Sequence, residues 1–77
     1  MKDWRIYIET NPNKMYGKPV ISGTRIPVDL ILEKMSNGET VEELLISYPH
    51  LTKEAIFACL KFASESIKTE KVYPLAS

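Results

Sequence analysis

The N-terminal third of the chain alternates apolar and polar residues and then becomes rich in glycine and proline. Apolar side chains recur at every second position in the first segment, at Trp4, Ile6 and Ile8. This is the period of a half-buried strand. Residues 10–13, Thr-Asn-Pro-Asn, have turn chemistry and end it. A second extended stretch is expected over 18–27, where two prolines favour extended backbone and the Ser-Gly pair at 22–23 favours a turn.

The middle of the chain changes to the period of a helix. Apolar side chains fall on one helical face of residues 28–36, at Val28, Ile31, Leu32 and Met35. Pro27 presets the backbone angle at the start of this helix, and Asn37-Gly38 is typical of its end. The same spacing predicts a second helix over 41–47, through Val41, Leu44, Leu45 and Tyr48.

Capping residues mark the remaining helix ends. Thr40 and Glu43 have the spacing of a capping box, and Pro49 stops the second helix. Thr52 is the expected N-cap of a third helix that ends at about Thr69. Leu51 and Ile56 lie at the positions of a hydrophobic staple. We expect the third helix to bury a wide apolar stripe: Ile56, Cys59, Leu60, Ala63 and Ile67, flanked by Phe57, Ala58 and Phe62.

These elements predict a mainly α fold. A short N-terminal β segment, about residues 4–27, precedes a three-helix helix-turn-helix bundle over about 28–70, and 71–77 is a short tail. With 77 residues, the chain is expected to form a single domain. A core this small favours self-association, so we expect a homodimer or a higher even oligomer. The alternating N-terminal segment would offer an exposed strand edge for pairing.

Composition narrows the setting of the protein. A single cysteine, Cys59, excludes an internal disulfide and suits a reducing cytoplasm. The longest apolar run, residues 55–60, is far shorter than a membrane span, and the N-terminus does not lead into the apolar core of a signal peptide. We therefore expect a cytoplasmic protein with no membrane partner.

Charge is balanced overall but unevenly distributed. The net charge is zero, yet residues 1–27 carry +3, residues 28–51 carry −4 and residues 52–77 carry +1. A strong nucleic-acid binder usually has one dominant basic patch. The monomer lacks such a patch, which disfavours tight DNA binding by a single copy.

Residues with catalytic or metal-binding chemistry are sparse. The only histidine, His50, has no cysteine or second histidine at ligand spacing, and a polar turn residue is the simplest interpretation. Cys59 lies on an apolar helix face and is interpreted as a core residue. Glu43 has a capping role, and Glu42 reads as a solvated residue. We therefore predict no catalytic residue, no metal site, no cofactor and no enzymatic activity.

Residues 16–28, YGKPVISGTRIPV, hold two glycines and two prolines. One interpretation is structural: glycine, proline and threonine set the bend that docks the β segment on the helices, and Arg25 pairs with a carboxylate of the acidic helices. The other is functional: Lys18 and Arg25 present charge to a partner.

This segment resembles the signature of the family called domain of unknown function 433. The resemblance is carried by Gly17, Lys18, Pro19, Val20 and Ile21, followed by Gly23, Thr24, Arg25, Ile26, Pro27 and Val28. It extends more weakly from Ile6 to Ile67. Tyr16 departs from the family pattern, which often has a second glycine there, and Ser22 stands where a basic residue is common.

The resemblance implies a homeodomain-like helix-turn-helix fold of small prokaryotic proteins, without established catalytic residues. Some relatives look like antitoxins of type II toxin–antitoxin pairs, encoded beside PIN-like nucleases. The favoured hypothesis is therefore an antitoxin-like protein that binds such a toxin and its own operator DNA. The alternative is a protein-interaction or dimerisation module without a DNA role. Nucleic acid would be contacted by the start and outer side of the third helix and by the signature segment: Thr52, Lys53, Lys61, Lys18 and Arg25.

Overall fold

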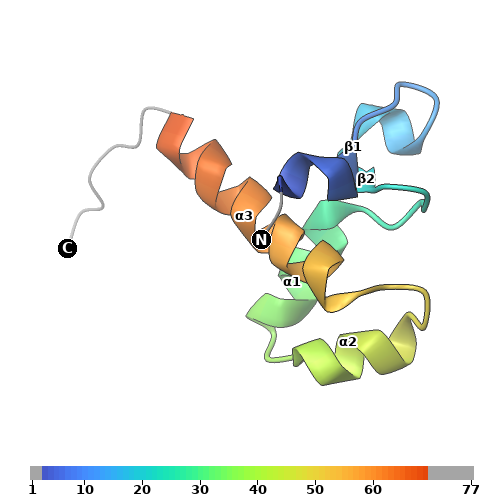
Figure 1. Ribbon diagram of the computed structural model, residues 1–77, viewed down its shortest axis with the longest axis vertical. Helices are drawn as coiled ribbons and strands as arrows, with labels where there is room; N and C mark the ends of the chain where they lie inside the picture. Colours follow the sequence, from blue (N-terminus) through green and yellow to red (C-terminus); the bar gives the residue numbers. More distant parts are fainter. Residues whose placement is uncertain (1–2, 70–77) are drawn as a thin grey trace.

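The computed structural model describes residues 3–69 and has the predicted mainly α fold (Figure 1). A two-stranded antiparallel β segment precedes three α-helices. In chain order the elements are η1 (Trp4–Tyr7), β1 (Ile8–Glu9), η2 (Met15–Gly17), β2 (Val20–Ile21), α1 (Val28–Ser36), α2 (Val41–Ser47) and α3 (Lys53–Thr69). Within the described residues, no helix combines the length and apolar character that crossing a membrane requires.

Helix α1 has the predicted bounds because its sequence supplies both a start and a stop. Pro27, with φ −68°, precedes the first turn. At the other end Gly38 adopts φ +96°. Its N–H donates to the Met35 carbonyl at 3.0 Å, and the Glu39 N–H donates to the Lys34 carbonyl at 3.1 Å. These two bonds satisfy carbonyls that the helix end would otherwise leave unpaired.

Helices α2 and α3 begin at the predicted caps. The Glu43 N–H donates to Thr40 Oγ1 at 3.1 Å, and the Thr40 N–H donates to Glu43 Oε1 at 2.8 Å. The backbone N–H of Thr40 holds the pKa of the Glu43 carboxyl below its usual value. Thr52 Oγ1 accepts the Ala55 N–H at 3.1 Å, so α3 begins directly after its N-cap. The capping box and the Thr52 cap are therefore confirmed.

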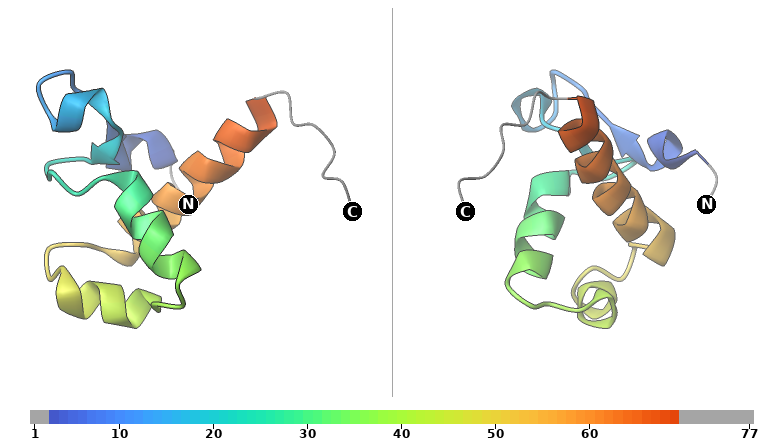
Figure 2. Two further views of the ribbon diagram at one scale, coloured as in Figure 1. Left: turned by 180° about the vertical axis from the view of Figure 1, so that it is seen from behind. Right: turned by 90° about the vertical axis from the view of Figure 1, so that its left-hand side faces the viewer.

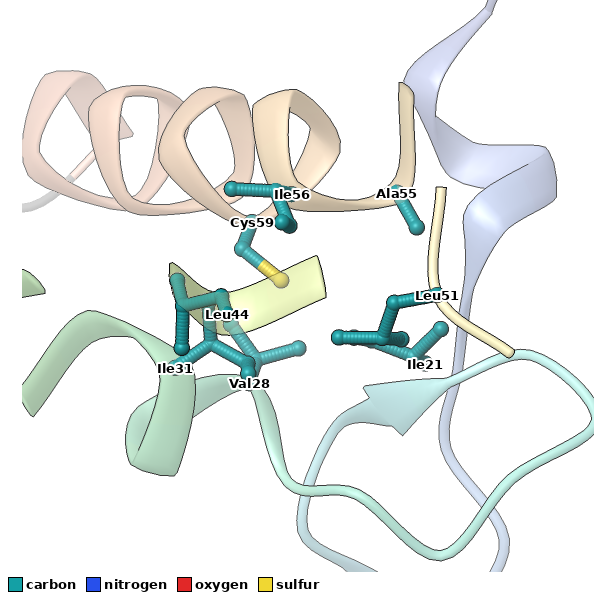
Figure 3. Packing of buried hydrophobic residues seen from close by; sticks show 8 residues of the cluster. All are labelled: Ile21, Val28, Ile31, Leu44, Leu51, Ala55, Ile56 and Cys59. Atoms are coloured by element: carbon teal, nitrogen blue, oxygen red, sulfur yellow. The ribbon is translucent and has the colours of Figure 1, made fainter. Parts of the chain in front are cut away.

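The core lies where the three helices meet β2 (Figure 3). Ile31, Leu44 and Ile56 supply one fully buried side chain from each helix. The Cys59 sulfur points into the same cluster, toward Leu44. The buried cluster consists of Ile21, Val28, Ile31, Leu44, Leu51, Ala55, Ile56 and Cys59. The apolar stripes predicted for the first two helices thus face the core.

The strand predicted from Trp4 is wrong for its first four residues, which form the 3₁₀ helix η1. Asp3 Oδ1 accepts the Arg5 N–H at 3.0 Å and caps this turn. In a 3₁₀ helix, side chains three apart share a face. Trp4 and Tyr7 therefore turn inward, whereas Ile6 is 60% exposed. The alternation of apolar residues had suggested the wrong period.

The β segment that remains is short. Ile8 pairs with Ile21 and Glu9 with Val20, and an isolated bridge joins Val20 to Pro27. The turn expected at 22–23 follows β2. Because residues 4–7 are not a strand, the exposed edge on which we based N-terminal pairing of two copies is absent from that segment.

The expected burial of the wide apolar stripe on α3 is only partly correct. Ala55, Ile56, Ala58 and Cys59 are buried, but Leu60 is 41% exposed and Ile67 is 58% exposed. A helix packed on one side of a small core buries one face. In addition, the C-terminal half of α3 extends past α1 and α2 (Figure 2). Leu60 and Ile67, which belong to the main predicted stripe, and the flanking Phe57 are therefore left exposed within the described residues.

Candidate binding surfaces

Most of the signature segment shapes the backbone that joins β2 to α1. Gly17 and Gly23 adopt φ +81° and +76°, which favour glycine. The Pro19 carbonyl accepts the Val28 N–H at 2.9 Å, so the segment closes on the first residue of α1. Pro27 forms the bridge to Val20 and precedes α1. These contacts support the structural interpretation.

Thr24 and Gly23 fix the turn between β2 and Pro27. Thr24 Oγ1 donates to the Ile21 carbonyl at 2.7 Å and accepts the Ile26 N–H at 3.0 Å. The Gly23 N–H donates to Glu9 Oε1 at 2.9 Å. That carboxylate also accepts the Lys14 ammonium at 3.2 Å. The Gly23 N–H, and after it the Lys14 ammonium, hold the pKa of the Glu9 carboxyl below its usual value.

The two cations of the signature segment differ in their surroundings. Lys18 Nζ lies 3.1 Å from Asp29 Oδ2 in an exposed ion pair. Arg25 is exposed, and no carboxylate within residues 3–69 forms an ion pair with it. The predicted pairing of Arg25 with the acidic helices is therefore wrong. It is Lys18 that forms an ion pair with a carboxylate of these helices, Asp29 of α1.

The residues proposed for nucleic-acid contact divide into three places, and one of them, Lys18, lies apart with its partner Asp29. Thr24 and Thr52 line the same pocket, so the turn that carries Arg25 lies beside the N-terminus of α3, where Lys53 is exposed. Lys61 lies two turns further along α3 and pairs with Glu65 at 4.0 Å. Thr52 uses its hydroxyl oxygen as the helix cap. Only part of the predicted contact set is thus assembled.

The pocket at the start of α3 has a volume of about 210 Å³. His50 forms part of its wall and, as predicted, lies exposed in the turn before α3. The other lining residues are Tyr7, Ile21, Ser22, Thr24, Leu51, Thr52 and Ala55. Among residues 3–69 no three metal-binding side chains come together. Burial raises the pKa of the Cys59 thiol to about 11, as suits a core residue.

A second surface, which the sequence analysis did not single out, lies at η2. Met15 and Tyr16 have φ +47° and +57°, the left-handed region that side chains other than glycine rarely adopt. Tyr16 is 100% exposed. Its chain neighbour Met15 lines a groove of about 490 Å³, together with Lys18, Pro27, Asp29, Leu30 and Glu33. The departure of Tyr16 from the glycine of the family pattern was the signal in the sequence.

The architecture defines a small three-helix domain, in which α2, a short turn and α3 form a helix-turn-helix arrangement behind a two-stranded β segment. Residues 8–63 match the family described as protein of unknown function (DUF433). The chain belongs to this family, and the resemblance seen in the signature segment is thereby confirmed.

Two relatives show how far the similarity extends. Uncharacterized protein y4eO of Sinorhizobium fredii is 35% identical over 52 residues, which cover 68% of this chain and 24% of that protein. The crystal structure of a DUF433 member from Anabaena variabilis superposes with a TM-score of 0.77 at 30% identity, covering 83% of this chain and 63% of the other. The chain thus spans about a quarter of the curated relative and less than two thirds of the crystallised one.

Proposed function

We propose that this protein is a non-catalytic protein-binding domain that acts in the cytoplasm as an antitoxin-like partner of a PIN-like nuclease. The observation that carries the proposal is the exposed, conformationally restricted Tyr16 beside the groove at η2. The antitoxin role comes from the family resemblance. Tyr16 and the groove at η2 are the surface that we propose contacts the nuclease.

Tyr16 adds backbone strain to the folded chain, and its side chain makes no packing contact within residues 3–69 that would offset this strain. The left-handed conformation costs roughly 1–2 kcal/mol for an L-residue other than glycine. A side chain that is 100% exposed buries no apolar surface against the rest of the described chain. Strained residues of this kind cluster at sites of function. Tyrosine is also among the residues that carry most of the energy at protein interfaces.

The groove beside Tyr16 indicates the chemistry of the partner. Met15 and Leu30 contribute apolar side chains to its lining, and each is partly exposed. Of the carboxylates on its rim, Asp29 is paired with Lys18, whereas Glu33 has no ion pair within residues 3–69. An apolar side chain next to an arginine would fit, because guanidinium can stack on Tyr16 and pair with Glu33.

The proposal requires a PIN-like nuclease gene next to the gene of this protein, and the test measures binding of that nuclease to the original chain and to the variant Tyr16→Gly. Glycine tolerates positive φ, so the melting temperature should be unchanged or higher. Binding measured by calorimetry should weaken by roughly 30-fold, the effect of losing a ~2 kcal/mol interface residue. Ile6→Ala, which truncates an exposed side chain on η1, is the control and should bind as the original chain does. Unchanged affinity of Tyr16→Gly would refute the proposal, as would a neighbouring nuclease that does not bind at all.

A second candidate function, operator binding, is favoured by Arg25 and Lys53. Both are exposed and neither forms an ion pair within residues 3–69, and the turn and helix start that carry them meet at the pocket. Lys53→Ala should weaken binding to upstream DNA and reduce the slope of log affinity against log salt by about one. Lys61→Ala, whose ammonium is already paired, should have a smaller effect. If the protein did not bind upstream DNA at low salt, operator binding would be refuted and only the protein-binding role would remain.

A further inference from the structure

Helix α3 carries an exposed apolar stripe that runs along one edge of its buried face. Phe57 is 45% exposed, Leu60 is 41% exposed and Ile67 is 58% exposed. With the exposed Ser64 they follow the spacing 3, 4, 3 along the helix. This is the spacing of the seam along which two helices pack in a coiled coil. We call Phe57, Leu60, Ser64 and Ile67 the outer seam.

The rest of the described chain does not cover the outer seam. Ala58 and Cys59 face the interior and are fully buried. Phe62 packs edge-on against Trp4, with ring centroids 5.8 Å apart, so η1 covers that side of α3. At 100° per residue, these three positions lie on the opposite side of the helix from the middle of the outer seam, whereas the buried Ile56 lies close in angle to Leu60 and Ile67, so the outer seam borders the buried face. The second half of α3 projects beyond α1 and α2 (Figure 1), and Ser64 and Ile67 in that half are exposed.

We propose that the outer seam pairs with the same seam of a second copy of this chain, with the two α3 helices antiparallel. A two-fold interface must be complementary to itself. Reversing the helix about Phe62 brings Phe57 of one copy to Ile67 of the other and Leu60 to Ser64. Each large apolar side chain thus meets another or meets a small serine, as packing between close helices requires.

The charges that flank the outer seam fit the antiparallel arrangement. Glu54, Lys61 and Lys68 lie seven residues apart along one edge of it. In the reversed pairing Glu54 of one copy lies within a helical turn of Lys68 of the other, and this pair occurs twice. Lys61 approaches its own equivalent once. The carboxylate of Glu65 lies 4.0 Å from Lys61 and 3.2 Å from Lys68 in the same copy, so it is shared between the two ammonium groups and offsets only part of that repulsion. The edge therefore supplies two attractive pairs between the copies.

This interface replaces the N-terminal pairing that the sequence had suggested. It also leaves Tyr16 and its groove outside the contact, so two nuclease-binding surfaces would be presented by one dimer. Dimerisation and nuclease binding are separately measurable, and one can fail without the other.

The first test measures mass by light scattering and sedimentation at tens of micromolar. The original chain should have twice the 8.8 kDa chain mass. Leu60→Glu should give a monomer, with the dissociation constant of the dimer raised by roughly tenfold or more, since it places two charges in the seam. Its circular dichroism should be unchanged because Leu60 lies at the surface. Ile46→Glu, on the exposed side of α2, is the matched control and should remain dimeric. A monomeric original chain, or a Leu60→Glu variant that dimerises as tightly, would overturn the proposal.

The second test addresses the direction of pairing. Glu54→Lys and Lys68→Glu should each weaken the dimer, and the double variant should recover affinity because the pair is restored with its charges exchanged. In a parallel pair these residues lie about 21 Å apart along the axis, at 1.5 Å per residue, so no recovery is expected. Additive weakening in the double variant would overturn the antiparallel arrangement.

Discussion

Leu44→Ala offers the sharpest test of the packing between the three helices. Leu44 is the only buried residue of α2, and its side chain is fully enclosed among residues of α1, α3 and β2. The substitution removes the contact by which α2 is anchored. Alanine retains helix propensity, so the change measures packing rather than helix formation.

The magnitude follows from the burial. Removing the equivalent of three methylene groups costs ~2.4 kcal/mol at ~0.8 kcal/mol each. A residual cavity of ~50 Å³ adds ~1.2 kcal/mol at ~24 cal/mol per Å³. The free energy of unfolding should therefore fall by about 3–4 kcal/mol. A domain of this size has a total of only about 4–12 kcal/mol, so the variant should lie close to the limit of folding.

Urea denaturation followed by circular dichroism, at one protein concentration, measures the difference. Ile46→Ala is the matched control, because it truncates an aliphatic side chain on the same helix that is 79% exposed. Its free energy of unfolding should stay within about 0.5 kcal/mol of the original. A decrease in the free energy of unfolding of less than about 1 kcal/mol for Leu44→Ala, or no larger than that for Ile46→Ala, would show that Leu44 is not part of the core.

Two further predictions concern titratable groups. Glu9→Gln should lower stability at neutral pH, because the carboxylate binds the Gly23 N–H and the Lys14 ammonium. Since folding lowers the pKa of Glu9 from its usual 4.5, its contribution is complete above pH 4.5 and is lost as the pH falls through the lowered value. Urea denaturation of the two proteins should therefore converge in acid, and a constant difference would exclude the ionic contribution. Cys59, with a pKa of about 11, should react with a disulfide reagent at pH 8 far more slowly in the folded protein than in urea. Equal rates would show that the thiol is accessible.

The helices were predictable because residues close to each helix end determine where the helix begins or stops. Thr40 with Glu43, Gly38 and Thr52 each satisfy backbone groups within a few residues of themselves, so the spacing alone locates the boundary. The N-terminal segment was not predictable in this way. Alternation of Trp4, Ile6 and Ile8 fits a strand, but capping by Asp3 and the contact of Trp4 with α3 favour a 3₁₀ turn.

The candidate sites were harder to predict because exposure depends on which side of each helix finds a partner. Leu60 has the same chemistry as Leu44, yet only the tertiary packing shows that one is a surface residue. The ion pair of Lys18 with Asp29 spans 11 residues and has no local signature. Tyr16 could have been identified earlier, because a tyrosine in place of a glycine implies strain if the backbone is kept.

The edge-on contact of Trp4 with Phe62 has a consequence for how the chain folds during synthesis. The two residues are separated by most of the sequence, and η1 packs against α3, which is synthesised after α1 and α2. The N-terminal turn must therefore wait for α3 before it is covered, whereas α1 and α2 can form from local contacts. Trp4 is the only tryptophan in the chain, so its fluorescence reports this last closure directly. A change in that fluorescence marks the docking of η1 on α3.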